Sequence, residues 1–259
     1  EFRHRLEKIL GPSVARLNMG TLHSTGARIL RMFGGEAGYN PDFHIFDTRD
    51  SYRILYKALR ELDITEAQMS ANSAYEQITR CKEQLQSVEV ALTQAEASFN
   101  ITDKDVAQVY ERYQQLLVEA GAMDFGDLVF NTVRLLETVP TVRDRTGLKH
   151  LLVDEFQDTD PAQFRMIDLL LCPERNLTAV GDVDQAIYRF RGADHRIMLN
   201  FEKHFPGAKR VTLGQNYRST RTIVRAAEQV ITRNVDRIQH DIWTENPDGY
   251  PVIVAQLGD

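Results

Sequence analysis

Two carboxylic acids directly follow a short apolar run in the segment LLVDEFQDTD at residues 151–160. The run is typical of a strand, and neighbouring residues that leave a strand point in different directions, so Asp154 and Glu155 can do different work. One carboxylate could hold Mg²⁺, which prefers oxygen ligands, while the other takes a proton from an attacking water. In a plainer interpretation the acids are solvated, and Asp158 or Asp160 caps the helix that follows.

A second polar cluster follows the next apolar run, in AVGDVDQAIYRFRGAD at residues 179–194. The amide of Gln185 can contact a phosphate oxygen or a bound water without adding charge. Aromatic and arginine side chains then alternate at residues 188–191. Aromatic faces can stack on nucleobases while guanidinium groups meet phosphates. The plainer alternative places Tyr188 and Phe190 in the core and the arginines on the surface.

A third cluster, LGQNYRST at residues 213–220, again follows a run with strand character. Arg218 could reach the terminal phosphate of a nucleotide as negative charge builds on it. Tyr217 offers a ring on which a purine could stack. In the alternative, Ser219 or Thr220 caps a helix and Arg218 is a surface charge.

Strand-like runs and helical stretches alternate after Gly121, which predicts an α/β fold with a parallel sheet and helical crossovers. The strand-like runs lie at residues 151–154, 177–182, 210–213 and 251–257. The helical stretches lie at residues 125–137, 161–171, 195–205 and 220–234. Because functional groups gather at the carboxyl ends of parallel strands, we expect the three polar clusters to converge on one site.

The first part of the chain is helical instead. Apolar residues recur at helical spacing at residues 23–34 and 51–62, and residues 74–99 and 103–120 contain no Gly or Pro. Gly34 and Gly35 mark the end of the first of these helices. The last helix carries one apolar stripe, which predicts a helix–helix core and consists of Val106, Val109, Tyr110, Tyr113, Leu116 and Leu117.

The composition excludes several classes of protein. With 259 residues, 42% of them hydrophobic and 26% charged, the chain has enough material for one large globular domain or two modest ones. The only two cysteines, Cys81 and Cys172, exclude a disulfide scaffold and a Cys-rich zinc site, and indicate a reducing, cytoplasmic setting. No apolar run approaches the ~20 residues that span a bilayer, so we expect no membrane partner.

Charge is unevenly distributed along the chain. The net charge is −6, but residues 189–237 hold eleven Lys and Arg against four Asp and Glu, a local balance of +7. This stretch is either a solvated basic face or a surface that faces phosphates.

In order and spacing, the three clusters resemble motifs II, III and IV of superfamily 1A DNA helicases, the UvrD/PcrA/Rep family. The matching segments are DEFQDT, GDVDQAIYRFRGA and NYRST. Further similarity lies in GTLHSTGARILR at 20–31, which resembles motif Ib, in AGAMDFGDL at 120–128, and in WTENPDG at 243–249. The resemblance covers nearly the whole chain, and the first two motifs together are highly specific.

The resemblance implies two RecA-like α/β motor domains with ATP bound between them, each with a helical insertion. The expected fold is an incomplete RecA-like P-loop NTPase motor domain with an inserted all-helical subdomain, followed by the start of a second RecA-like domain. The expected parts are 1–38 of the first motor domain, 39–120 as the helical insertion, 121–206 as the remainder of that motor domain, and 207–259 as the start of the second.

The resemblance also implies a role for each matching residue at the nucleotide. Asp154 would hold Mg²⁺, and Glu155 would activate the attacking water. Gln185 would couple the γ-phosphate of ATP to the DNA site. Arg218 would contact the γ-phosphate from the second motor domain, and Tyr217 would stack on adenine.

On the DNA side, the resemblance implies that Tyr188 and Phe190 stack on bases, with Arg191 nearby. His23 and Phe125 are further candidates for DNA contacts. The implied partners are single-stranded and partly duplex DNA, together with proteins of DNA repair or replication.

One motif of such enzymes is absent, because no G-x-x-x-x-G-K-[ST] occurs in the 259 residues. We therefore expect an internal fragment of an ATP-dependent 3′-to-5′ DNA helicase, inactive by itself because no such loop cradles the β- and γ-phosphates. Two other interpretations stay open. One is the motor part of an AddA/RecB-type helicase–nuclease, and the other is a non-hydrolysing nucleic-acid-binding module.

Overall fold

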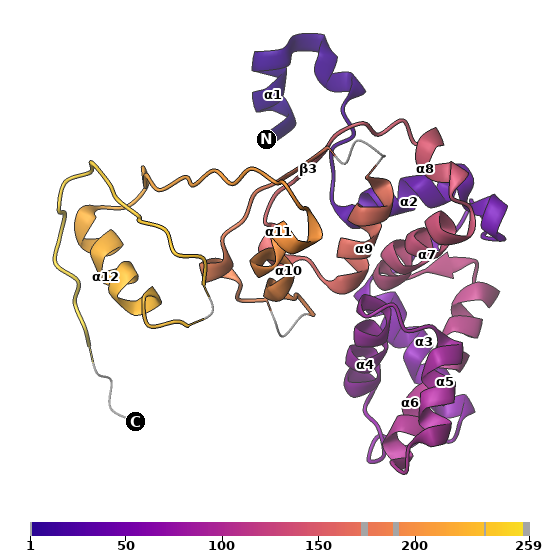
Figure 1. Cartoon of the computed structure of the whole chain (residues 1–259). Coiled ribbons are helices and arrows are strands. Elements are labelled where there is room, and N and C mark those ends of the chain that lie inside the picture. The colour runs from indigo at the N-terminus through magenta and orange to yellow at the C-terminus, as the bar shows by residue number, and fades with distance from the viewer. Residues whose placement is uncertain (1, 172–175, 189–191, 236, 256–259) are drawn as a thin grey trace. The chain divides into compact units, whose positions relative to one another are not determined.

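The chain divides into two units, which are described separately. The computed structural model describes residues 2–171, 176–188, 192–235 and 237–255 (Figure 1). The first unit comprises Glu1–Val153 and Asp160–Thr178, and the second comprises Asp154–Thr159 and Ala179–Asp259. The chain thus enters the second unit twice, first at Asp154, directly after a strand, and again at Ala179, within a strand.

The first unit is mainly helical. Its helices are α1 (Phe2–Leu10), α2 (Leu22–Phe33), α3 (Thr48–Glu61), α4 (Ala71–Glu83), α5 (Val88–Ala97), α6 (Ile101–Glu119), α7 (Phe125–Thr138), α8 (Thr141–Arg145) and α9 (Pro161–Leu170), with 3₁₀ turns η1 (Gly11–Arg16) and η2 (Gly34–Ala37). Its strands are β1 (His44–Ile45), β2 (Ala122–Met123), β3 (Leu151–Val153) and most of β4 (Leu177–Ala179).

Two hydrophobic cores hold the first unit together. One core lies among α2, α7 and α9, where α2 packs closely on α7. A Cβ on Gly26 would lie 2.5 Å from the carbonyl oxygen of Leu128, so only glycine permits this approach. The other core lies among α3, α4 and α6, which stand together in Figure 1. All six residues of the predicted stripe on α6 are buried, which confirms that prediction.

Helix boundaries differ from the prediction at three places. The stretch 74–99 is two helices, because Leu85 adopts a left-handed conformation (φ 57°) and Ser87 caps the second helix. Helix α2 ends at Phe33 as predicted, but the chain continues as η2 and reverses only at Gly38 (φ 82°). The stretch 195–205 is likewise interrupted, at Asn200.

The strands form two pairs. In one, β1 runs parallel to β2, with His44 opposite Ala122. In the other pair, β3 lies beside β4. The backbone N–H of Leu151 donates to Asn176 O and that of Phe156 donates to Val180 O, so donor and acceptor both move toward the C-terminus, as in parallel pairing. The predicted strands at 151–154 and 177–182 are thus confirmed in their first three residues.

The other two predicted strands are wrong for the described residues. Residues 210–213 and 251–255 form no strand, and residues 256 and 257 lie outside the described part of the chain. Val211, Leu213 and Ile253 are 67–88% exposed. Apolar β-type residues form a strand only where a neighbouring strand takes up their backbone hydrogen bonds, and no described strand lies beside these segments.

The second unit holds the 3₁₀ turns η3 (Phe156–Asp158) and η4 (Val183–Gln185), and helices α10 (His195–Leu199), α11 (Phe201–His204) and α12 (Arg221–Ile231). Both 3₁₀ turns contact α10. The rings of Phe156 and Phe201 meet edge to face, with centroids 5.4 Å apart, and fix η3 against α11. No helix among the described residues is both long and apolar enough to cross a membrane.

Candidate nucleotide and DNA site

The acidic turn after β3 presents two exposed carboxylates. Asp154 accepts a hydrogen bond from the backbone N–H of Glu155 at its Oδ1 atom (3.0 Å), and its other oxygen has no hydrogen bond within the described residues. Glu155 adopts a left-handed backbone conformation (φ 50°, ψ 42°). A non-glycine residue held there costs of order 1 kcal/mol, and such strain gathers at functional sites. The turn thus exposes both carboxylates and holds one of them on a backbone conformation that few non-glycine residues adopt.

Gln157 joins this acidic turn to the turn after β4. It is 2% exposed, and its Nε2 donates a hydrogen bond to Glu155 Oε2 (2.7 Å). Its Oε1 accepts a hydrogen bond from the backbone N–H of Asp182 (3.0 Å). Two of the three predicted segments are therefore brought together by one buried amide.

Asp182 organises the turn after β4. Its Oδ1 accepts a hydrogen bond from the backbone N–H of Asp184 (3.0 Å), and its Oδ2 accepts one from Gln185 Nε2 (2.7 Å). Gln185 is exposed, as a residue that contacts a ligand must be. A continuous chain of hydrogen bonds thus runs from Glu155 through Gln157 and Asp182 to Gln185.

The third segment, around Tyr217 and Arg218, is held by the loop that carries Asn246. Asn216 Oδ1 accepts hydrogen bonds from the backbone of Arg218 (3.0 Å) and Ser219 (2.8 Å). Asn246 Nδ2 donates to the carbonyl oxygens of Tyr217 (3.2 Å) and Ser219 (3.0 Å). The segment WTENPDG at 243–249 is therefore the support of NYRST at 216–220.

Tyr217 and Arg218 themselves are exposed, with 78% of Tyr217 accessible. The Tyr217 hydroxyl donates to Gln215 Oε1 (2.6 Å). Within the described part of the chain, no hydrogen bond or ion pair joins either residue to Glu155 or Gln185. The convergence of all three segments on one nucleotide stays a prediction.

One buried ion pair does connect η4 with the segment after α12. Arg237 contacts Asp184 Oδ2 (2.8 Å), and both side chains are more than nine-tenths buried. The Oδ1 of Asp184 and the Nε of Arg237 have no hydrogen-bond partner among the residues that the structure describes. The pair is thus only partly satisfied.

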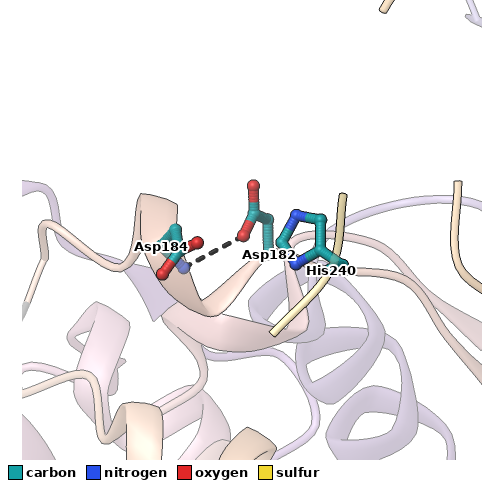
Figure 2. Close-up of side chains that lie close together, drawn as sticks. All are labelled: Asp182, Asp184 and His240. Carbon is teal, nitrogen blue, oxygen red and sulfur yellow. Dashed lines mark hydrogen bonds between the residues drawn. The ribbon is translucent and has the colours of Figure 1, made fainter. Parts of the chain in front are cut away.

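Asp182, Asp184 and His240 lie close enough to suggest a cation site (Figure 2). Their available hydrogen bonds argue against that assignment. Both oxygens of Asp182 already accept hydrogen bonds, and the guanidinium of Arg237 already neutralises Asp184. Asp154 keeps one carboxylate oxygen without a hydrogen bond among the described residues, and its predicted role as a magnesium ligand stays a prediction.

The predicted DNA-side residues are only partly described. His23 and Phe125 are brought together in the first unit, with ring centroids 6.0 Å apart in an edge-on contact. Burial lowers the pKa of His23, and the charge of Asp124 opposes that shift. Tyr188 is 39% exposed, whereas Phe190 and Arg191 lie outside the described residues.

The basic stretch 189–237 is partly neutralised within the described residues. Four of its arginines lie beside acids: Arg196 with Asp194, Arg210 with Glu202, Arg221 with Asp248, and Arg237 with Asp184. Its exposed cations include Lys203, Lys209, Arg218, Arg225 and Arg233.

A buried charge cluster in the first unit escaped the sequence analysis. Lys82 Nζ lies 2.7 Å from Asp124 Oδ2 and 2.8 Å from Asp127 Oδ1, and Lys82 is 1% exposed. The Tyr113 hydroxyl also donates to Asp124 (2.9 Å). The two acids cap α7 reciprocally, and their spacing of three residues was the available signal for that cap. Asp160, and not Asp158, caps α9.

Comparison with known proteins decides the family. The family model of the UvrD/REP helicase N-terminal domain matches residues 1–206. The chain belongs to the UvrD/REP helicase family. The segments at 151–160 and 179–194, joined by Gln157, both lie inside the matched range. The mixed helix-and-strand architecture agrees with the N-terminal domain of such helicases.

Similar proteins in this family are described as ATP-dependent DNA helicase PcrA. That of Bacillus subtilis (strain 168) is 37% identical over 254 residues, which is 97% of this chain and 34% of the relative. That of Staphylococcus aureus (strain Mu50 / ATCC 700699) is 37% identical over 254 residues, and that of Leuconostoc citreum is 37% identical over 253 residues; each covers 96% of this chain. The chain spans about a third of the length of these relatives.

Proposed function

We propose that this chain belongs to an ATP-dependent DNA helicase that couples ATP hydrolysis to 3′-to-5′ movement on single-stranded DNA and to duplex unwinding. The observation that carries the proposal is the link between the two UvrD/REP motif segments. A strained, exposed acidic turn is joined to Gln185 by Gln157 and Asp182 through three hydrogen bonds of 2.7–3.0 Å.

The proposed roles follow from the chemistry of each group. Bound Mg²⁺ would supply positive charge at the β- and γ-phosphates of ATP. Asp154 offers it an unpaired carboxylate oxygen. Glu155, held as an acceptor by Gln157, takes the proton of the attacking water. Gln185 contacts the γ-phosphate and changes position when that phosphate is lost.

The third segment completes the nucleotide site in this proposal. Arg218 brings positive charge to the γ-phosphate as hydrolysis proceeds. The exposed ring of Tyr217 stacks on adenine. Asn246 supports this segment through the carbonyl oxygens of Tyr217 and Ser219.

The finer architecture is part of the same proposal. Residues 1–38 and 121–206 belong to a first RecA-like motor domain, residues 39–120 to a helical insertion, and residues 207–259 to the start of a second motor domain. The separate hydrophobic core among α3, α4 and α6 supports the insertion.

DNA is the proposed partner of the opposite side of the site. Tyr188, Phe190 and Arg191 follow Gln185 within six residues, so one segment can contact both ATP and DNA. His23 and Phe125 add an aromatic pair on the first unit. We place the activity in DNA repair or replication, in the cytoplasm, with proteins of those processes as further partners.

The test uses the full-length protein that contains this chain. We expect single-stranded DNA to stimulate its ATP hydrolysis, and Glu155→Gln to lower kcat by about 10²- to 10⁴-fold, because the variant loses the general base. Glu66→Gln, an exposed acid on the first unit, is the matched control and keeps wild-type turnover. Binding of single-stranded DNA without any ATP hydrolysis by the wild type would instead favour a non-hydrolysing module.

A further inference from the structure

Gln157 is the only buried residue in the hydrogen-bond chain between Glu155 and Gln185 among the described residues. The orientation of its amide is determined by its partners. The backbone N–H of Asp182 can only donate, so the amide oxygen of Gln157 must face it (3.0 Å). The NH₂ group must then face Glu155 Oε2, at 2.7 Å.

This orientation has a chemical consequence for Glu155. A general base acts only when its carboxylate is held within hydrogen-bond reach of the proton that it takes. The donation fixes where Glu155 Oε2 lies, on a backbone turn that is itself strained. A side chain that could not donate would leave Glu155 without this restraint.

The amide of Gln157 lies close to the backbone of Gly181. A Cβ on Gly181 would lie 2.5 Å from Gln157 Oε1 and 2.9 Å from the sulfur of Met198. The absence of a side chain at Gly181 therefore leaves room for both the Gln157 amide and the Met198 side chain. The same Asp182 that receives Gln157 also holds Gln185 (2.7 Å), so a movement of Gln185 reaches Glu155 through two residues.

We propose that Gln157 is a positioning residue, which holds the Glu155 carboxylate in place and in register with the turn that carries Gln185. It does not contact ATP. This inference rests on the proposed function, because it assigns Gln157 to the hydrolytic step in which Glu155 is the base. It predicts that hydrolysis depends on the ability of residue 157 to donate a hydrogen bond.

The decisive experiment is a pH profile of DNA-stimulated kcat for Gln157→Glu in the full-length protein. At pH 8 the introduced carboxylate cannot donate and repels Glu155, so we expect kcat to fall at least tenfold. As the pH falls, the introduced carboxyl becomes protonated, donates to Glu155 and still accepts from Asp182. The ratio of variant to wild-type kcat should therefore rise severalfold between pH 8.5 and pH 6.

Two further variants separate positioning from a merely structural role. Gln157→Leu fills the same space without any hydrogen bond, so its loss of kcat should be similar at every pH. Gly181→Ala displaces the Gln157 amide from the other side and should also lower kcat while the KM for ATP changes less than threefold. Gly35→Ala is the matched control, because a Cβ there meets nothing within 4 Å. Thermal unfolding of each variant verifies that it is folded.

Each outcome is decisive. If the wild type is active and Gln157→Glu stays within twofold of it at every pH, the inference is wrong while the proposed function stands. A loss in Gln157→Glu that is independent of pH, as in Gln157→Leu, would also overturn it. If the wild type hydrolyses no ATP, the proposed function is wrong and the inference falls with it. Should one position-157 variant fail to fold, the kcat of Gly181→Ala decides.

Discussion

Carboxylates are used in opposite ways in the two units. In the first unit, Asp124 and Asp127 are buried, and Lys82 and Tyr113 satisfy their oxygens. In the second unit, the acids that follow β3 are exposed, one of them on a strained backbone. Buried, fully paired charge fixes the geometry of a scaffold, whereas exposed and incompletely paired charge is available to a ligand.

The pKa shifts of Lys82, Asp124 and Asp127 reflect this burial and pairing. Burial acts to raise the pKa of Asp124, but the charge and hydrogen bond of Lys82 outweigh it and hold this pKa below its ordinary value. Burial, and then the charge of Asp124, raises the pKa of Asp127 to about 6. Burial acts to lower the pKa of Lys82, and the two carboxylates outweigh it. The three side chains therefore depend on one another, because removal of one charge leaves the others buried without their partner.

The largest effect is therefore expected at Lys82. Lys82→Ala leaves two acids buried without their cation, and we expect it to lower the free energy of unfolding by about 3–5 kcal/mol, measured by urea denaturation. Lys57→Ala is the control, because Lys57 is exposed and 3.8 Å from Glu61, and such pairs contribute about 0–1 kcal/mol.

A rescue variant sharpens this prediction. Lys82→Met combined with Asp124→Asn and Asp127→Asn removes all three charges and keeps acceptors for the helix cap, so it should regain most of the stability lost in Lys82→Ala. A loss of less than about 1 kcal/mol in Lys82→Ala would show that the cluster is not the restraint described here.

A smaller effect is expected from pH, through Asp160. Burial raises the pKa of this helix cap to about 6. Since the folded state then binds the proton more tightly than the unfolded chain, the stabilisation is complete below about pH 4 and is lost as the pH rises to about 6. Between about pH 4 and pH 6, the free energy of unfolding of the wild type should therefore fall by about 2–3 kcal/mol more than that of Asp160→Asn, measured by unfolding at several pH values.

A matched cap in the same unit should behave in the opposite way. Asp47 caps α3 at the surface, and the hydrogen bond from the backbone N–H of Asp50 lowers its pKa. Its contribution is present above its ordinary pKa and is lost as the pH falls. Equal signs for Asp47→Asn and Asp160→Asn would contradict the assignment of burial as the cause at Asp160.

The buried pair in the second unit should lie between the two extremes. Asp184 and Arg237 each keep one buried polar atom without a partner, so their pairing is less complete than that of Lys82. We expect a coupling of about 1–2 kcal/mol from the double-mutant cycle of Asp184→Asn and Arg237→Gln, measured as free energies of unfolding. A coupling as large as the Lys82 effect would remove the contrast between the two units.

The smallest effect on stability is expected at the site acids. Asp154→Asn and Glu155→Gln should change the free energy of unfolding by less than about 0.5 kcal/mol, because both side chains are exposed. Glu155→Gln should nevertheless abolish most turnover of the full-length protein. A decrease of more than about 2 kcal/mol in the free energy of unfolding, measured by heat or urea, would show that these acids stabilise the fold.

Much of this molecule was determined by local sequence. The apolar stripe on α6 and the three-residue spacing of caps are properties of a few consecutive residues, so periodicity and side-chain type predict them. The family motifs likewise lie within short segments, and the match over residues 1–206 confirms the family that they indicated. The candidate site acids could be predicted for the same reason, since an apolar run followed by DEFQDT is a local feature of the sequence.

Only the tertiary structure decided the pairing of distant residues. Lys82 meets Asp124 across 42 positions, and Gln157 meets Asp182 across 25, distances over which side-chain type predicts nothing about contact. The failed strands at 210–213 and 251–255 have the same cause, because a strand depends on a neighbour that the local residues do not specify. Local propensity sets which elements can form, and long-range contacts decide which of them do and which polar groups they bring together.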